Sequence, residues 1–193
     1  GKTTLLETLM GNTRVMRGAV RWCGKDLGRW PSYRRVRAGL GWVPQEREVF
    51  PSLTVEENLT VVARPGPWHL RRVYEFFPRL RERRGNYGNQ LSGGEQQMLS
   101  IGRALMTNPS VLLMDEPTEG LAPVIVETLT AVLAKLRGDS GLSIILVEQN
   151  SRVALGFSDR CVVLDKGRIV YDGPSAALRD DPERLAKLIG VSE

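Results

Sequence analysis

Two segments of this chain carry residues that could act on a phosphate group. The first is a serine followed by two glycines, Ser92, Gly93 and Gly94, just before a helical pattern. Glycines let a backbone approach a ligand closely, and the N–H groups at the start of a helix attract anions. The second is the acidic pair Asp115 and Glu116, which follows an apolar run. Such carboxylates could hold Mg²⁺ and activate water, so the chemistry predicted is phosphoryl transfer from a nucleotide.

The acidic pair follows a predicted strand. Residues 111–114 are all apolar, which is typical of a strand that is covered on both faces. Open α/β sheets bind their ligands at the carboxyl ends of such strands. We therefore expect Asp115 to hold Mg²⁺ and Glu116 to polarise the attacking water. The alternative is that Asp115 to Thr118 only cap the next helix.

The chain opens with Gly1-Lys2-Thr3-Thr4, the second half of the phosphate-binding pattern G-x-x-x-x-G-K-[ST]. Lys2 would contact the β- and γ-phosphates, and the Thr3 hydroxyl would contact Mg²⁺. The helix that begins here adds a favourable field for an anion. Taken alone, these four residues are a weak signal. We expect the chain to be a fragment of a longer protein, cut inside this loop.

A third candidate is Gln45, which follows a short apolar segment at 40–44. Its neutral amide could contact Mg²⁺ and the attacking water. Taken alone it would be an ordinary loop residue, but its position ahead of Ser92 favours a role at the site. The chain's one histidine, His69, lies in a helical segment and is interpreted as a surface residue.

Hydrophobic periodicity predicts the elements that position these residues. Strands are expected at 18–25, 40–44, 111–114, 144–147, 162–164 and 169–171, with a turn at Lys166-Gly167 and a hairpin closed by Asp172-Gly173. Helices are expected at 2–10 before Gly11, after a capping box of Thr54 and Glu57, at 70–77 before Pro78, after Gly94, at 125–136, and near Ala176 and Leu185.

Buried strands that alternate with helices predict an α/β fold with a mostly parallel, doubly wound sheet. The segment from about residue 50 to 107 contains only helical patterns. We expect it to form a helical subdomain inserted between two strands of the sheet.

The composition is that of one ordinary globular domain, with 193 residues, 41% hydrophobic and 25% charged. The net charge of +5 permits contact with acidic surfaces. One run stands out, formed by Arg79, Arg81, Arg83 and Arg84. We interpret it as a solvated helix end, and contact with nucleic acid or lipid headgroups is the alternative.

Cysteine usage and hydropathy limit the other classes. Cys23 and Cys161 are far apart and have no histidine partners, which argues against a metal site or a disulfide framework and suits a reducing compartment. No apolar run approaches the ~18 residues of a membrane span, and no secretory signal is present. We expect any membrane role to pass through a partner.

Together, the motifs resemble those of the ATP-binding subunits of ABC transporters along the whole chain. The general motifs are the phosphate loop at 1–4, the glutamine loop at 41–45, the signature at 91–97 and the carboxylate strand at 111–116. Three further stretches resemble more closely the subunits of branched-chain amino acid importers, namely 48–59, 119–123 and 146–150.

The resemblance implies a P-loop NTPase fold, in which residues 1–193 form a partial ABC nucleotide-binding domain that lacks the N-terminal strands. It implies ATP and Mg²⁺ as ligands and ATP hydrolysis coupled to transport. The implied nucleotide-binding residues are Gly1, Lys2, Thr3, Thr4, Gln45 and Asp115, of which Thr3, Gln45 and Asp115 would hold Mg²⁺. Glu116 and Gln149 would be catalytic. The signature residues presented to the partner's ATP would be Leu91, Ser92, Gly93, Gly94, Glu95 and Gln96.

The resemblance also implies partners. These are a second ATPase subunit paired head to tail (the same chain or a related one), membrane permease subunits and, indirectly, a solute-binding protein, without nucleic acid. The subunit is expected in the cytoplasm, on the inner face of the cell membrane. The transported solute would be a branched-chain amino acid, urea or a short amide.

Two positions depart from the general family pattern. Gln149 stands where most relatives have histidine, and a glutamine cannot take up a proton near neutral pH. That favours Glu116 as the base, with Gln149 as an orienting contact. Ala122 stands where many relatives have aspartate, which leaves coupling between subunits open.

Two other functions are alternatives. A soluble ABC ATPase of translation or DNA repair is disfavoured because the spacing from Gln45 to Ser92 leaves no room for a long coiled coil. A non-hydrolysing regulatory subunit is the second alternative, and Gln149 and Ala122 motivate it.

Overall fold

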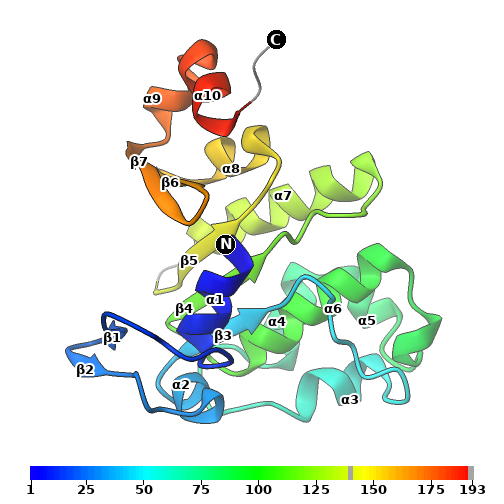
Figure 1. Ribbon diagram of the computed structural model, residues 1–193. Coiled ribbons are helices and arrows are strands. Elements are labelled where there is room, and N and C mark those ends of the chain that lie inside the picture. The colour runs from blue at the N-terminus through cyan, green and yellow to red at the C-terminus, as the bar shows by residue number, and fades with distance from the viewer. Residues whose placement is uncertain (139–140, 191–193) are drawn as a thin grey trace.

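The computed structural model describes residues 1–138 and 141–190 (Figure 1). Its central element is a three-stranded parallel sheet in the order β3-β4-β5. These strands are Leu40–Val43, Val111–Asp115 and Ser143–Val147. Leu40 pairs with Val111, and Val111 pairs with Ser143. Two antiparallel pairs accompany this sheet, β1 (Arg21–Trp22) with β2 (Lys25–Asp26) and β6 (Arg160–Asp165) with β7 (Arg168–Pro174).

Helices fill most of the remaining chain. They are α1 (Lys2–Met10), α2 (Ser32–Arg37), α3 (Val55–Thr60), α4 (Leu70–Phe76), α5 (Pro78–Glu82), the 3₁₀ helix η1 (Gly88–Gln90), α6 (Gly93–Met106), α7 (Pro123–Gly138), α8 (Ser151–Phe157), α9 (Ala176–Arg179) and α10 (Pro182–Ile189). Among the described residues, no helix combines the length and the apolar character needed to cross a membrane.

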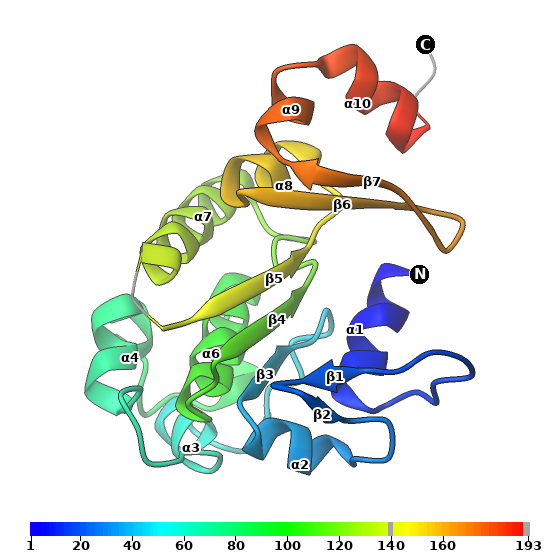
Figure 2. The same ribbon diagram turned by 90° about the vertical axis from the view of Figure 1, so that its left-hand side faces the viewer.

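Strand β4 is buried on both faces because helices cover both sides of the sheet (Figure 2). Leu112 and Met114 belong to the apolar core that includes residues of α6 and α7. Val111 and Leu113 belong to a second core that includes Leu6 of α1. The alternation follows from the strand period of two, and it confirms the predicted α/β class with a parallel sheet.

Local sequence signals mark the helix ends correctly. Gly11 ends α1 with φ of 82°, a left-handed conformation that glycine adopts without strain. Thr54 begins α3 through the predicted capping box, in which its hydroxyl and the Glu57 carboxylate bond each other's backbone N–H groups. Pro78 starts a new helix after α4 has ended at Phe76. These short-range patterns needed no tertiary information.

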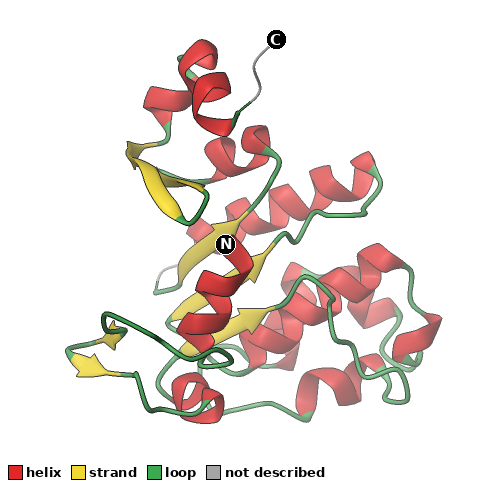
Figure 3. Ribbon diagram, viewed as in Figure 1, coloured by secondary structure: helices red, strands yellow, loops and turns green. Residues whose placement is uncertain are grey.

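Between β3 and β4 the chain forms only helices, as expected (Figure 3). Their apolar residues join the core of the sheet, since Val55 and Leu59 of α3 share one cluster with Leu112 and Met114 of β4. The division into a sheet domain and a helical subdomain therefore stays a prediction. Residues 139–140 and 191–193 of the predicted domain lie outside the described residues.

The single strand predicted at 18–25 is wrong. The segment instead makes a tight hairpin, in which β1 and β2 pair across Cys23 and Gly24. Both turn residues have positive φ, 48° and 77°, which matches a two-residue hairpin turn. Lys166 and Gly167 form the same kind of turn between β6 and β7, with φ of 44° and 77°.

Two details of the C-terminal hairpin also differ from the prediction. Asp172 and Gly173 do not close it but lie within β7, opposite Val162 and Cys161. The strand β6 pairs only with β7 among the described strands, so it does not extend the parallel sheet. Its residues are either exposed or half-buried, which differs from the continuous burial of β4.

A buried arginine anchors α1. Arg35 is 2% exposed, and its guanidinium donates to backbone carbonyls at 2.7–3.0 Å. The acceptors are Thr8, Leu9, Leu27 and Trp30. Two of them lie in the last turns of α1, where carbonyls lack partners within the helix. Arg35 thus fixes the helix that carries Lys2 and Thr3.

Candidate functional site

The start of α1 lies close to the carboxyl end of β4. Lys2 and Thr3 lie in the first turn of the helix, close to Asp115. The Thr3 hydroxyl and the Lys2 ammonium both lower the pKa of Asp115, which favours its charged form. Gly1 precedes the helix and its carbonyl accepts the N–H of Leu5 at 3.0 Å. Thr4 is exposed in the same turn. The free N–H groups here give this end of the helix a partial positive charge.

Asp115 is fully buried, and neither carboxylate oxygen has a hydrogen-bond partner of good geometry among the described residues. Burial raises the pKa of Asp115, while Thr3 and Lys2 act in the opposite direction and Glu119 adds to the rise. A buried carboxylate without donors is costly unless a cation accompanies it. Two orphaned oxygen atoms therefore fit a Mg²⁺ site.

The oxygen atoms of Asp115 and Thr3 suit Mg²⁺ better than they suit a metal that is bound by protein ligands alone. In the described part of the chain, no group of three or more His, Cys, Asp or Glu residues is arranged to hold a metal. Mg²⁺ is usually bound through one or two carboxylates, with waters and substrate phosphates as the other ligands. Asp115 and the Thr3 hydroxyl match that pattern.

Glu116 has an unusual backbone for a non-glycine residue, with φ of 46°. Such a conformation costs about 1–3 kcal/mol and persists where the surrounding structure holds it. The Glu116 N–H donates to the carbonyl of Val147 at 2.8 Å, and its carboxylate accepts from the Gln149 side-chain amide at 2.6 Å. Burial raises the pKa of Glu116, and the Gln149 hydrogen bond opposes that rise.

Gln45 follows β3, and its side-chain amide donates to the carboxylate of Glu119. Glu119 raises the pKa of both Asp115 and Glu116 by repulsion. The structure thus brings Gln45 to the same acidic cluster as the residues after β4. In the sequence, Glu119 stands out only as part of the stretch at 119–123 that resembles amino acid importers. Its short spacing after the acidic pair was the signal that could have identified it.

A second unpredicted contact ties two loops together. The hydroxyl and the N–H of Thr118 both donate to one carboxylate oxygen of Glu148, at 2.7 and 3.2 Å. Thr118 follows β4 and Glu148 follows β5, so the contact braces the loops that carry Glu116 and Gln149. No short-range pattern in the sequence indicated this pairing.

The signature residues lie at the start of α6. The N–H and hydroxyl of Ser92 donate to one oxygen of Glu95 at 2.9 and 3.0 Å, and the Glu95 N–H donates to the Ser92 hydroxyl at 3.4 Å. Leu91 is buried before them. The Gln96 side chain donates to the carbonyl of Gly88 at 3.2 Å. The serine therefore caps its own helix, and its hydroxyl proton points at Glu95.

Packing explains the two glycines of the signature. A side chain at Gly94 would begin 2.7 Å from a methyl group of Ile125, and one at Gly93 would begin 3.0 Å from the Arg47 guanidinium. Arg47 also bonds Gln97 at 3.3 Å. Close packing is thus one reason for the glycine pair, in addition to the ligand access that we expected.

Within one chain, the signature and the acidic pair do not meet. Among the described residues, no hydrogen bond or ion pair joins residues 91–96 to Asp115 or Glu116. The structure gathers Lys2, Thr3, Gln45 and Gln149 with the acidic pair but leaves Ser92 apart.

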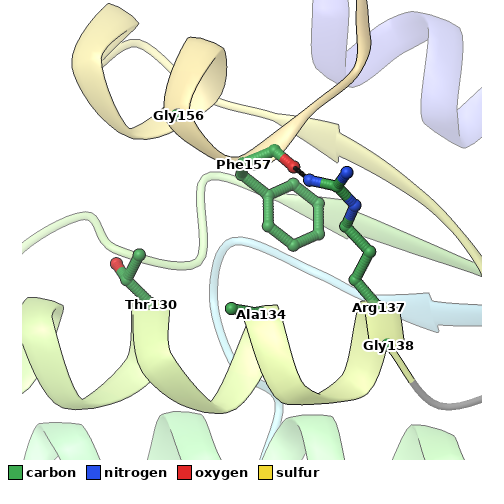
Figure 4. A pocket seen from close by; sticks show the side chains of 6 residues that line it. All are labelled: Thr130, Ala134, Arg137, Gly138, Gly156 and Phe157. Carbon is green, nitrogen blue, oxygen red and sulfur yellow. Dashed lines mark hydrogen bonds between the residues drawn. The ribbon is translucent and has the colours of Figure 1, made fainter.

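A pocket of about 470 Å³ between α7 and α8 is unrelated to this cluster (Figure 4). It is lined by Thr130, Ala134, Arg137, Gly138, Gly156 and Phe157. Arg137 is already engaged by the carbonyl of Phe157 and by Asp159, both at 2.5 Å. No predicted site residue lines it.

Known proteins with similar sequences share one family. The family model described as "ABC transporter" matches residues 1–119. The high-affinity branched-chain amino acid transport ATP-binding protein BraG of Pseudomonas aeruginosa is 44% identical over 188 residues, which cover 95% of this chain and 80% of BraG. The probable branched-chain amino acid transport ATP-binding protein LivF of Archaeoglobus fulgidus is 37% identical, with coverage of 97% and 81%.

Solved structures agree on the fold. A nucleotide-free ATP-binding cassette from an ABC transporter has a TM-score of 0.82 at 24% identity, and the match covers 100% of this chain and 84% of that one. The ADP conformation of an ATP-binding cassette gives 0.78 with the same coverage and identity. Family model, relatives and fold lead to one conclusion: the chain belongs to the ABC transporter family, as an ATP-binding subunit with ATPase activity.

Proposed function

We propose that this ATPase subunit powers the import of branched-chain amino acids. The support is the 44% identity to BraG and 37% to LivF, both of which are named for that transport. A relative with another cargo, the lipopolysaccharide export protein LptB of Haemophilus influenzae, is 32% identical. The cargo is the finer part of the proposal, since an ATPase subunit does not itself contact it.

The observation that carries a catalytic role is the acidic pair at the end of a buried strand, opposite the start of α1. The amine of Lys2 and the free N–H groups of α1 would bind the phosphates of ATP. Thr3, Asp115 and the amide oxygen of Gln45 would hold Mg²⁺, which would neutralise phosphate charge. Glu116 accepts a proton from the attacking water, and Gln149 holds the Glu116 carboxylate in place.

The missing half of the site would come from a second subunit. Because Ser92 caps its own helix away from the acidic pair, one chain alone leaves ATP without the signature contact. A head-to-tail pair, of identical or related chains, would bring the serine and glycines of each copy to the ATP of the other. ATP then favours the paired state, and hydrolysis removes that preference.

The subunit would act on the inner face of the cell membrane. Permease subunits would contact the surface around Gln45 to Phe50 and the helical segment at about 50–107, and a solute-binding protein would take part indirectly. No nucleic acid is expected. Transport would follow from the change between paired and separated states.

Mixing two inactive variants of the full-length protein tests the composite site. A Ser92→Arg chain keeps its acidic pair, and a Glu116→Gln chain keeps its signature. The Glu116→Gln chain alone should lose about 10²–10⁴ in phosphate release, the range typical of a lost general base. The Ser92→Arg chain alone should not turn over, because the arginine blocks the signature contact. An equal mixture should regain activity, because each mixed dimer contains one intact site.

A matched control is a mixture of Glu116→Gln with Asp115→Asn, which damage the same half and should not recover. Absence of recovery in the first mixture, with dimers shown to exchange, would refute the composite site. For the cargo, phosphate release by the complete transporter in vesicles should rise with leucine, isoleucine and valine. Stimulation by urea or short amides instead would overturn the assignment.

A further inference from the structure

Glu95 divides its carboxylate between two groups. One oxygen accepts the N–H and the hydroxyl of Ser92, at 2.9 and 3.0 Å. The other oxygen faces two arginines, Arg79 and Arg83, whose Nε atoms each lie 3.4 Å away. The Glu95 side chain is only 12% exposed, whereas Arg79 and Arg83 are 56% and 43% exposed.

This arrangement bears on how Ser92 could bind a phosphate. The Ser92 hydroxyl has one proton, which Glu95 holds in the structure. A phosphate oxygen that accepts a hydrogen bond from this hydroxyl must replace the Glu95 carboxylate as the acceptor. The phosphate would then lie beside the negative charge of Glu95. Like charges at such short range repel strongly where water is excluded. Without compensation, Glu95 would oppose the contact for which the signature serine is needed.

We propose that Arg79 and Arg83 are positioning residues that neutralise Glu95 and so release Ser92 to the ATP of the partner subunit. The inference rests on the composite site proposed above. Two guanidinium groups on the far oxygen offset the carboxylate charge and weaken the near oxygen as an acceptor. The serine hydroxyl can then turn to the phosphate.

The two arginines do not contribute equally. Arg79 also pairs with Glu82 at 2.5 Å, so its charge is shared. Arg83 pairs only with Glu95 among the described residues, so its charge is not shared with another carboxylate. The remaining arginines of the run, Arg81 and Arg84, make no ion pair with Glu95 in the described part of the chain. Arg79 and Arg83 are exposed, as expected of a solvated helix end, but they also pair with Glu95.

The charge of Glu95 persists under physiological conditions. Burial opposes ionisation, but the hydrogen bonds from Ser92 and the charges of Arg83 and Arg79 lower its pKa overall. A side chain that stays ionised this close to the proposed phosphate contact needs a lasting counter-charge. Arginine supplies one because its guanidinium remains protonated.

The test uses the full-length protein with Glu116→Gln, so that ATP is bound and not consumed. Replacing both Arg79 and Arg83 by alanine should raise the ATP concentration needed for half-maximal dimerisation about tenfold. Adding Ser92→Arg to these variants prevents dimerisation, so that binding of ATP to the monomer can be measured. This binding should not change when the arginines are replaced. The matched control replaces Arg81 and Arg84 by alanine, because it removes the same number of charges from the same run without breaking an ion pair to Glu95.

A further substitution separates charge from structure. Glu95→Gln keeps the capping box, since glutamine also serves at that position, but carries no charge. Added to the double arginine variant, it should restore dimerisation to the level of the parent. If the arginines only supported the local structure, Glu95→Gln would not restore dimerisation. The double variant should still fold, because exposed ion pairs contribute little to stability.

Three results would overturn the inference: dimerisation unaffected by the Arg79 and Arg83 double variant, an equal loss in the Arg81 and Arg84 control, or no rescue by Glu95→Gln. If the Glu116→Gln parent itself fails to dimerise with ATP, the composite site fails, and the inference fails with it. If the Glu116→Gln parent dimerises normally and the arginine variants dimerise equally well, the inference about Arg79 and Arg83 is refuted, while the composite site is not.

Discussion

The side-chain amide of Gln149 donates a 2.6 Å hydrogen bond to the carboxylate of Glu116, across the carboxyl ends of two neighbouring strands. The amide does not take up a proton near neutral pH, so it can orient the carboxylate but cannot replace it as a base. The pairing supports Glu116 as the proton acceptor for water. It also makes the pKa of Glu116 depend on Gln149.

Replacing Gln149 by alanine should therefore change the pH profile of ATP hydrolysis. The hydrogen bond favours the charged carboxylate, so its loss raises the pKa of Glu116 further. The acid limb of kcat should move to higher pH, and kcat near pH 7 should fall about tenfold or more. Phosphate release across pH measures both effects. Asn150→Ser, a neighbouring change that keeps a capping residue, should leave the limb in place; an unmoved limb in Gln149→Ala would contradict the coupling.

Replacing Glu119 by glutamine should move the same limb in the other direction. The charge of Glu119 raises the pKa of Glu116 by repulsion, so removing it lowers that pKa. Glutamine can still accept the hydrogen bond from Gln45, which keeps the contact. The acid limb should shift to lower pH with little loss of kcat on the plateau. A shift to higher pH would show that Glu119 acts by some means other than its charge.

Periodic and short-range features of this chain could be predicted from sequence. The apolar run before Asp115 identified a strand buried on both faces, and the caps at Gly11 and Thr54 marked helix ends. Each of these depends on neighbours in the chain. Asp115 and Glu116 could be proposed because open α/β sheets bind ligands at the carboxyl ends of their strands. Gln149, after β5, was proposed from the resemblance to ABC transporter subunits.

The features that escaped prediction join residues far apart in sequence or depend on rare backbone conformations. Residue types did not indicate that Cys23 would adopt positive φ, so a hairpin was taken for one strand. The contact of Glu148 with Thr118, and that of Glu119 with Gln45, exist only once the sheet is assembled. Sequence spacing alone gives no sign of such pairs.

Thr118→Val tests the brace between the two loops. Valine matches threonine in shape but lacks the hydroxyl, which leaves the half-buried Glu148 with only the backbone donor. The free energy of unfolding should fall by about 1–2 kcal/mol. Hydrolysis should fall as well, since the loops carry Glu116 and Gln149. Urea titration and phosphate release measure the two effects, and a variant with normal kcat would show that the brace serves stability alone.

Asp115→Asn should stabilise the protein in the absence of nucleotide. Burial raises the pKa of Asp115 above its ordinary value of 3.8, so the folded state binds the proton more tightly than the unfolded state does. Stability is therefore lost as pH rises from the ordinary value through the raised one, and the loss persists at pH 7. Asparagine avoids this loss, and a gain of about 1 kcal/mol is expected. ATP hydrolysis should collapse, because a neutral amide holds Mg²⁺ poorly.

The pH dependence of that gain is the control. Wild type and Asp115→Asn should have similar unfolding free energies below the ordinary pKa of the carboxyl, and they should diverge as pH rises. Lower stability of Asp115→Asn at pH 7 would contradict the account of Asp115 as a buried carboxylate whose desolvation outweighs the effects of Thr3 and Lys2.

Arg35→Met should weaken both the fold and nucleotide binding. The guanidinium donates to carbonyls of α1 and of the loop before α2, and methionine fills similar space without any donor. The carbonyls of Thr8 and Leu27 would keep one backbone donor each, whereas those of Leu9 and Trp30 would lose the guanidinium donor, and the loss should cost roughly 2–4 kcal/mol of unfolding free energy. Because α1 carries Lys2 and Thr3, ATP affinity should fall with it. Arg35→Lys should lie between, since an ammonium cannot match the planar fork of donors. The neighbouring exposed Arg34→Met should unfold at the wild-type urea concentration, and equal midpoints for both methionine variants would exclude Arg35 as the anchor of α1.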